Sequence, residues 1–105
     1  MGAQECRALS EAMFYTLMCM QKHEICGSEI AAAVSARTNG RVRLGPGTLY
    51  TILGKFLDEK LIIETAVDGR KRTYAITDAG RAAYAAEITR LNQCILDAQR
   101  EEEEK

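Results

Sequence analysis

Hydrophobic and polar positions along the first sixty residues follow helical periodicities. Apolar residues between about 4 and 22 recur at helical spacing and surround nearly the whole axis, which indicates burial on two sides. An alanine-rich run from 29 predicts a short second helix that ends near Thr38-Asn39-Gly40. Pro46 suits the first turn of a third helix, which the apolar stripe extends to about residue 60. We therefore expect three helices in this half of the chain.

The remaining residues change periodicity twice. Residues 61–67 are rich in β-branched side chains, Asp68-Gly69 is typical of a tight hairpin turn, and residues 70–76 alternate as a second strand. Thr77-Asp78 offers an N-cap for a long last helix that runs from Ala79 to about Arg100. This helix carries apolar residues at the four-three spacing of a coiled-coil seam, namely Tyr84, Ile88, Leu91, Ile95 and Ala98.

The order of three helices, a hairpin and a long helix predicts a mainly α fold with a small β-hairpin, a winged helix-turn-helix. Residues 1–76 would form the DNA-binding domain, whose first helix also dimerises, and residues 77–105 a dimerisation helix with an acidic tail. At 105 residues both parts belong to one compact domain. The sequence contains no apolar run of transmembrane length and no signal-peptide pattern, so we expect a cytoplasmic protein.

The distribution of charge along the chain favours a nucleic-acid partner, although the net charge does not. The formal net charge is −1, but residues 37–72 contain eight basic and four acidic side chains, a local net charge of +4. The acidic run Glu101–Glu104 offsets this charge at the other end of the chain and is typical of a solvated terminus. The middle of the chain is therefore the candidate for contact with phosphates.

Two groups of side chains are the candidate DNA contacts. The third helix turns Thr48, Tyr50, Thr51 and Lys55 away from its apolar stripe, towards the major groove in this kind of fold. The hairpin adds the wing cations Arg70, Lys71 and Arg72, which would reach the flanking backbone or the minor groove. Two structural alternatives stay open, because an exposed Tyr50 can pack on the connector and cations at a strand edge also prevent aggregation.

Further candidates flank these groups. Arg43 and Arg41 in the connector either contact phosphate or serve only to solvate the chain. Ser28 either caps the second helix or contacts a phosphate.

The first and last helices are the candidate dimer interface, because the other elements are too small to cover the long seam. The predicted interface residues are Leu9, Met13, Tyr84, Ile88, Leu91 and Ile95. A cavity for a small aromatic or hydrophobic effector is a further hypothesis, although the same residue types fill ordinary cores. Its candidate lining is Met13, Phe14, Leu17, Leu91 and Cys94.

No residue pattern indicates catalysis or a cofactor. His23, the sole histidine, lies in a polar break without a nucleophile or carboxylate pattern beside it, and no glycine-rich phosphate loop is present. Cys19, His23 and Cys26 lie within eight residues, but zinc requires a fourth ligand and the usual spacing is missing. We expect Cys6, Cys19, Cys26 and Cys94 to be reduced thiols without metal, and a redox role for them is a separate hypothesis.

Two segments resemble PadR-type transcriptional regulators. These are residues 44–55 (LGPGTLYTILGK) and residues 68–80 (DGRKRTYAITDAG), and the likeness covers most of the chain. The length of the chain is similar to that of the short PadR subfamily, whose members have a single C-terminal helix. The resemblance implies a homodimer whose first and last helices pack across a two-fold axis, with Thr48, Tyr50 and the wing cations near DNA. Members are usually repressors, and several release DNA when a phenolic acid or planar drug binds.

The chain departs from this pattern at two places. It has no tryptophan, and Leu91 stands where multidrug-binding relatives carry a stacking indole. Residues 26–30 read CGSEI where many relatives have HGYEI, so an aromatic residue is lost beside the second helix.

The leading hypothesis is therefore a ligand-responsive repressor that binds a palindromic operator as a homodimer. The alternative is a winged-helix protein-interaction module without sequence-specific DNA binding.

Overall fold

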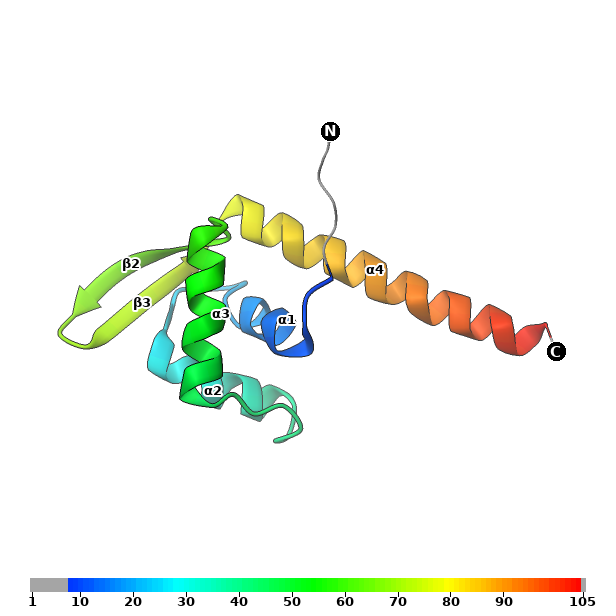
Figure 1. Ribbon diagram of the computed structural model, residues 1–105, viewed down its shortest axis with the longest axis horizontal. Helices are drawn as coiled ribbons and strands as arrows, with labels where there is room; N and C mark the ends of the chain where they lie inside the picture. Colours follow the sequence, from blue (N-terminus) through cyan, green and yellow to red (C-terminus); the bar gives the residue numbers. More distant parts are fainter. Residues whose placement is uncertain (1–7, 105) are drawn as a thin grey trace.

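The computed structural model describes residues 8–104 and contains four helices and a small antiparallel sheet in that range (Figure 1). It confirms the predicted mainly α fold with a β-hairpin. In chain order the elements are α1 (Glu11–Met18), β1 (Ile25–Cys26), α2 (Gly27–Arg37), α3 (Pro46–Asp58), β2 (Ile62–Asp68), β3 (Lys71–Ile76) and α4 (Asp78–Glu103).

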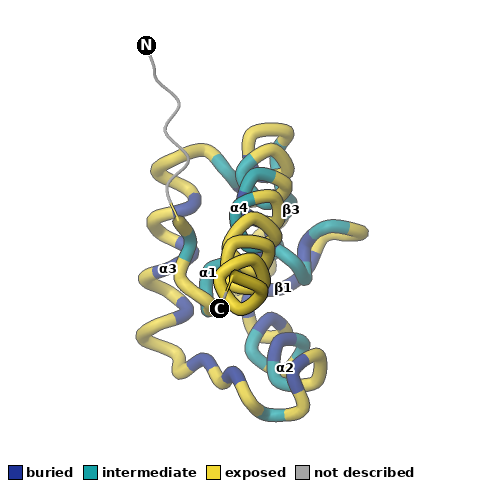
Figure 2. Tube along the Cα trace, turned by 90° about the vertical axis from the view of Figure 1, so that its right-hand side faces the viewer, coloured by how far each residue is buried: buried dark blue, intermediate teal, exposed yellow. Residues whose placement is uncertain are grey.

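Helices α1, α2 and α3 gather at one end of α4, and the β2–β3 hairpin projects from the same end (Figure 1). The core fills the space between these elements. Its fully buried members include Leu17 of α1, Ile30 of α2, Phe56 of α3 and Ile62 of β2. By contrast, every described residue of α4 from Asn92 onward is exposed, as Figure 2 shows for the end of this helix nearest the viewer. The core therefore supports the three short helices and the hairpin, and half of α4 lies outside it.

Local signals set most of the helix ends. Ser10 caps α1, because its Oγ accepts a hydrogen bond from the Met13 N–H at 3.1 Å. The first helix is thus shorter than predicted at both ends, although residues 4–7 lie outside the described range. The predicted cap of α4 is confirmed: Thr77 Oγ1 accepts from the Gly80 N–H at 3.0 Å. Asn39 and Gly40 adopt positive φ angles of 54° and 79° after α2, as expected.

The third helix buries the predicted stripe of Leu49, Ile52, Leu53 and Phe56. It ends at Asp58, two residues earlier than expected, and Leu57 is 37% exposed although the stripe predicted it to face inward. The last turn of α3 therefore lies at the edge of the core.

The sequence did not predict strand β1, which pairs Ile25 with Tyr74 and Cys26 with Thr73. Two residues are too few to show the alternation of a strand, and the partner strand is far away in sequence. The sheet therefore has three strands in the order β1-β3-β2. The prediction that Ser28 caps the second helix was wrong, because Cys26 occupies the N-cap and Ser28 lies inside α2.

The start of α4 packs closely on the turn between α3 and β2 and on the end of β3. At Gly80, an added Cβ would overlap the Leu61 carbonyl oxygen and approach Ile76 Cγ1 to 2.6 Å. The same carbonyl accepts the Thr77 N–H at 3.0 Å, and Thr77 Oγ1 donates to the Lys60 carbonyl at 2.7 Å. Only glycine therefore permits this approach of α4 to the Leu61 backbone.

We predict that Gly80→Ala destabilises the protein by about 3 kcal/mol, because the methyl group forces α4 away from the sheet. Gly54→Ala is the matched control, since a Cβ at this other helical glycine meets nothing within 4 Å. Alanine there should raise stability by roughly 0.5–1 kcal/mol through helix propensity. Urea unfolding followed by circular dichroism measures the change in unfolding free energy of both variants. Equal effects of the two substitutions would contradict this interpretation of Gly80.

Candidate nucleic-acid interface

The outward face of α3 presents four of the predicted contact residues to solvent. Thr48, Tyr50, Thr51 and Lys55 are all exposed, and Tyr50 is 63% exposed. The opposite face of the helix is held by the core, so these side chains project from a fixed support. Hydroxyls, one phenol and one ammonium group are the donors and acceptors that phosphates and base edges require.

Tyr74 fixes the hairpin beside α2 and α3. It is 4% exposed, and its ring lies 3.4 Å from the position that a Cβ would take at Gly27, the first residue of α2. Burial raises the pKa of the Tyr74 phenol, and the charge of Glu64 acts in the same direction. The hairpin is therefore packed on the helices at its base, and the turn at Gly69 is at its far end.

The three wing cations are exposed at this far end of the hairpin. Arg72 pairs with Glu64 on the neighbouring strand, with 2.9 Å between Nη1 and Oε2. Such a solvated pair contributes little stability and exchanges readily for a phosphate. Arg70 and Lys71 directly follow the positive-φ turn residue Gly69, so they lie at the tip of the hairpin.

The two connector arginines have different roles in the fold. Arg41 reaches back to α1, where Nη1 lies 2.6 Å from Glu11 Oε2 and Nη2 donates to the Tyr15 hydroxyl at 3.0 Å. Arg43 is exposed, and its Nε donates to the Gly40 carbonyl at 3.1 Å within the connector. Arg41 therefore tethers the connector to α1, and Arg43 keeps its terminal nitrogens at the surface.

Ser28 is exposed in the first turn of α2, where its Oγ lies 3.3 Å from Cys26 Sγ. The N–H groups of this turn carry the positive end of the helix dipole. The position suits a phosphate contact, which is the alternative that stays open for Ser28.

The predicted dimer residues divide into two groups. All of Leu9, Met13, Tyr84 and Leu91 are half-buried. Leu9 and Leu91 lie where the α1 segment meets α4, Phe14 stacks on Tyr84 with ring centroids 5.2 Å apart, and Met13 lies beside the first turns of α3. Ile88 and Ile95 are 38% and 54% exposed on α4. The first group thus packs within the chain, and the second leaves apolar surface on the helix.

The candidate effector residues do not share one environment. Phe14 and Leu91 line a cavity between α1 and α4 together with Leu9 and Glu87. Leu17 is fully buried in the core, Met13 is half-buried, and Cys94 is exposed. A larger cavity lies elsewhere, between α1, α2 and α4.

The carboxylate of Glu87 is buried, with 3% of the residue exposed, which the sequence pattern did not predict. Arg90 binds both of its oxygens, with 3.0 Å from Nε to Oε1 and 2.6 Å from Nη2 to Oε2. These hydrogen bonds hold the pKa of Glu87 below its ordinary value of 4.5, against the opposing effect of burial, and a bond from the Leu9 N–H lowers it further. Glu87 thereby fixes the start of α1 to α4. The signal in the sequence was an acid three residues before an arginine on an apolar helix face.

We predict a pH-dependent loss of stability in Glu87→Gln. Because the folded-state pKa is depressed, the ionised carboxylate stabilises the fold above about pH 4.5, and this contribution is lost as pH falls through the folded-state pKa. Glu87→Gln should therefore be less stable than wild type at pH 7, and the difference should shrink towards pH 3. The exposed control Glu101→Gln should match wild type throughout. Thermal unfolding between pH 7 and pH 3 measures these stabilities. A difference between wild type and Glu87→Gln that stays constant over this range would contradict a stabilising role of the ionised Glu87 carboxylate.

The cysteines and histidine show no grouping for a metal. Among residues 8–104, no three His, Cys, Asp or Glu side chains lie together in a way that could hold an ion, and Cys6 is outside this range. Burial raises the pKa of the Cys19 thiol to about 11, which lowers its thiolate fraction and its reactivity. Within the same range, no helix is both long and apolar enough to cross a bilayer.

The fold, with α2 and α3 followed by a β2–β3 wing, defines a winged helix-turn-helix protein. The model of the transcriptional regulator PadR-like family matches residues 16–86. The chain belongs to this family, whose members are transcriptional regulators and not enzymes. This match confirms the predicted resemblance to PadR-type regulators and the prediction that the protein is not an enzyme. A comparison with curated proteins finds no match.

Solved structures support the same fold. H. salinarum RosR superposes with a TM-score of 0.68 at 20% identity, over 95% of this chain and 91% of that one. A PadR family transcription regulator of Clostridium difficile gives 0.67 at 18% identity, over 91% and 100%. Bacillus subtilis PadR in complex with operator DNA gives 0.64 at 21% identity, over 72% of this chain and 46% of its own.

Proposed function

We propose that this protein is a ligand-responsive repressor that binds a palindromic operator as a homodimer. The observation that carries the proposal is the exposed face of α3, where Thr48, Tyr50, Thr51 and Lys55 project from a helix whose other side is fixed in the core. In helix-turn-helix proteins this helix enters the major groove. The solved complex of B. subtilis PadR with operator DNA, a structurally similar protein, supports operator DNA as the partner.

The wing completes the DNA contact in this proposal. Arg70, Lys71 and Arg72 follow the turn of the hairpin, at the end farthest from the base held by Tyr74. Cations at the tip of a wing beside α3 would reach phosphates that flank the major groove. Arg43 and Ser28 contribute to the same surface as phosphate contacts.

The proposed dimer forms through α1 and α4, with residues 77–105 as the dimerisation segment and residues 1–76 as the DNA-binding part. Helix α4 has 26 residues, which corresponds to about 39 Å, and the core covers only its first half. Ile88 in the first half of α4 and Ile95 in the second are one heptad apart, with 38% and 54% of their surface accessible. Burial of such a seam against a second copy removes apolar surface from water.

Neutralising the tip of the wing should weaken operator binding selectively. In Arg70→Gln/Lys71→Gln the Arg72–Glu64 pair is retained, so the hairpin keeps its fold. We expect a loss of affinity of about tenfold or more for the DNA upstream of the protein's own gene, and a log–log salt slope that is smaller by about three to four, because each of the two subunits loses two cations. Fluorescence anisotropy at several salt concentrations, with a scrambled duplex for comparison, measures both quantities.

The control variant Arg100→Gln/Lys105→Gln removes the same two charges at the end of the chain. Its affinity and salt slope should stay near wild type. Equal losses in both variants would show a general effect of net charge and would contradict a wing contact. Unchanged binding in the wing variant, or wild-type binding without preference for the upstream duplex, would favour the protein-interaction module.

The proposed dimer predicts a position-specific effect of charge on α4. Ile88→Glu/Ile95→Glu places carboxylates on the seam, and the protein should then sediment as a monomer at concentrations where wild type is dimeric. Thr89→Glu is the control, because Thr89 is exposed and lies about 100° round the helix from Ile88. Analytical ultracentrifugation distinguishes the states, and a monomeric wild type would refute the dimer.

A further inference from the structure

One face of α4 carries a column of exposed side chains whose order is self-complementary. The α4 column consists of Arg81, Ile88, Ile95 and Glu102, which follow one another at intervals of seven residues and are all exposed. Seven residues are close to two helical turns, so these side chains lie along one line of the helix surface. The line runs from a cation through two apolar residues to an anion. Such a face fits a second copy of itself in one direction only.

The charged ends of the α4 column do not pair within the chain. Among residues 8–104, neither Arg81 nor Glu102 forms an ion pair. The two residues are 21 positions apart in the sequence, which corresponds to about 32 Å along the helix, so they cannot reach each other. Each charge is therefore available to a partner outside the chain.

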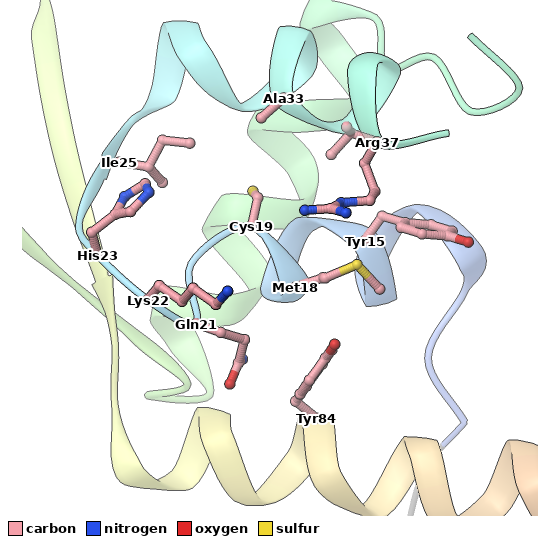
Figure 3. A pocket seen from close by; sticks show the side chains of 11 residues that line it. Tyr15, Met18, Cys19, Gln21, Lys22, His23, Ile25, Ala33, Arg37 and Tyr84 are labelled. Carbon is pink, nitrogen blue, oxygen red and sulfur yellow. The ribbon is translucent and has the colours of Figure 1, made fainter. Parts of the chain in front are cut away.

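The start of the α4 column is a basic site. Arg81 Nη1 donates to the Gln21 carbonyl at 2.9 Å, and the next residue, Lys22, is exposed. Figure 3 shows Gln21 and Lys22 on the segment beside Tyr84, which lies about one turn along α4 from Arg81. A guanidinium has five N–H donors, so this single hydrogen bond leaves others for a carboxylate. Two cations thus adjoin here, although Asp78 adds one negative charge in the first turn of α4.

The direction of pairing decides whether these charges attract or repel. In a parallel pair of α4 helices about a two-fold axis, each Glu101–Glu104 run would lie against the same run of the second copy, and like charges side by side are destabilising. In an antiparallel pair centred between residues 91 and 92, Ile88 faces Ile95 of the second copy. The same register sets Arg81 opposite Glu102. Only the antiparallel direction therefore satisfies the apolar and the charged positions together.

The shape of the chain favours the same direction. Helices α1, α2 and α3 gather at one end of α4, and every described residue of α4 from Asn92 onward is exposed (Figure 1). Antiparallel pairing lays the exposed half of each α4 along the covered half of the other and keeps the two groups of short helices apart. It also sets the exposed Ala85 opposite Ala98 of the second copy, and such small side chains allow two helices to approach closely.

We propose that α4 binds α4 of a second copy in the antiparallel direction, with Glu101 and Glu102 of each copy on Arg81 and Lys22 of the other. The acidic run then serves as a docking segment at both ends of the interface. This inference specifies the partner surface of the proposed homodimer and rests on that dimer, but it does not rest on operator binding.

The test is the dissociation constant of the dimer, measured on the full-length protein by analytical ultracentrifugation with fluorescence detection. Glu102→Arg should weaken the dimer about tenfold at low salt, because each dimer contains two of these contacts and both become repulsive. The difference should shrink at high salt, where exposed charges are screened. Glu103→Arg is the matched control, since it makes the same change in net charge about 100° round the helix from Glu102. Its dissociation constant should stay within about twofold of wild type.

Exchange of the two charges separates contact between copies from effects within one chain. In Arg81→Glu/Glu102→Arg, opposite charges face each other again, so the dissociation constant should return to within about threefold of wild type. The two positions are too far apart to interact in one chain, so this recovery reports a contact between copies. A second variant, Arg81→Gln/Glu102→Arg, removes the repulsion and keeps a donor for the Gln21 carbonyl. It should recover part of the loss even where Arg81→Glu disturbs the start of α4.

Three results would overturn the antiparallel pairing. These are an unchanged dimer in Glu102→Arg, equal losses in Glu102→Arg and Glu103→Arg, and a loss that neither substitution of Arg81 reduces. A monomeric wild type would overturn the pairing together with the proposed dimer. Operator affinity is measured on the same samples by fluorescence anisotropy. A wild type that dimerises and binds operator DNA, with Glu102→Arg equally dimeric, would overturn the pairing alone and leave the proposed repressor in place.

Discussion

The pairing of β1 with β3 is the interaction on which the rest of the structure depends. It joins the residues just before α2 to the second strand of the wing, and it buries Tyr74 against the first turn of that helix. Helix and wing are thereby fixed relative to one another, although 45 residues separate Gly27 from Arg72 in the sequence. A hairpin alone is marginally stable in water, so this third strand gives the wing a defined direction. Without it, the cations of the wing would have no fixed distance from α3.

The elements of this fold could be predicted wherever the signal was local. Pro46, the Asp68-Gly69 turn and the Thr77 cap each determine their own neighbourhood, and the structure confirms all three. The exposed positions of α3 followed from the spacing of its apolar residues. Strand β1 could not be predicted because its partner residues lie 47 and 49 positions further along the chain and a two-residue strand has no periodicity of its own.

The less predictable features of the candidate sites have the same origin. Glu87 looks like one more surface acid in the sequence, but the fold places it against Arg90 and the start of α1. The cavity beside Tyr84 collects side chains from α1, α2 and α4 that show no common spacing. The roles of Ile88 and Ile95 also depend on what covers them, and a second copy is the proposed answer.

The arrangement of charge reconciles a net charge of −1 with a DNA-binding function. Basic side chains gather on the connector, α3 and the wing, whereas four consecutive glutamates lie at the far end of α4. Because the structure holds these ends apart, the acidic run does not neutralise the proposed DNA surface at short range. In a dimer joined through α1 and α4, two such surfaces would be related by a two-fold axis.

Hydroxyl-radical footprinting on the upstream DNA reports DNA contact and two-fold symmetry in one experiment. We expect two related sets of protected sugars, centred about one or two helical turns apart and arranged symmetrically on the two strands. Substitution of the wing should remove the protection that flanks each set and leave its centre. A single unsymmetrical footprint, or no protection at protein concentrations that saturate nonspecific binding, would contradict a two-fold DNA-binding regulator.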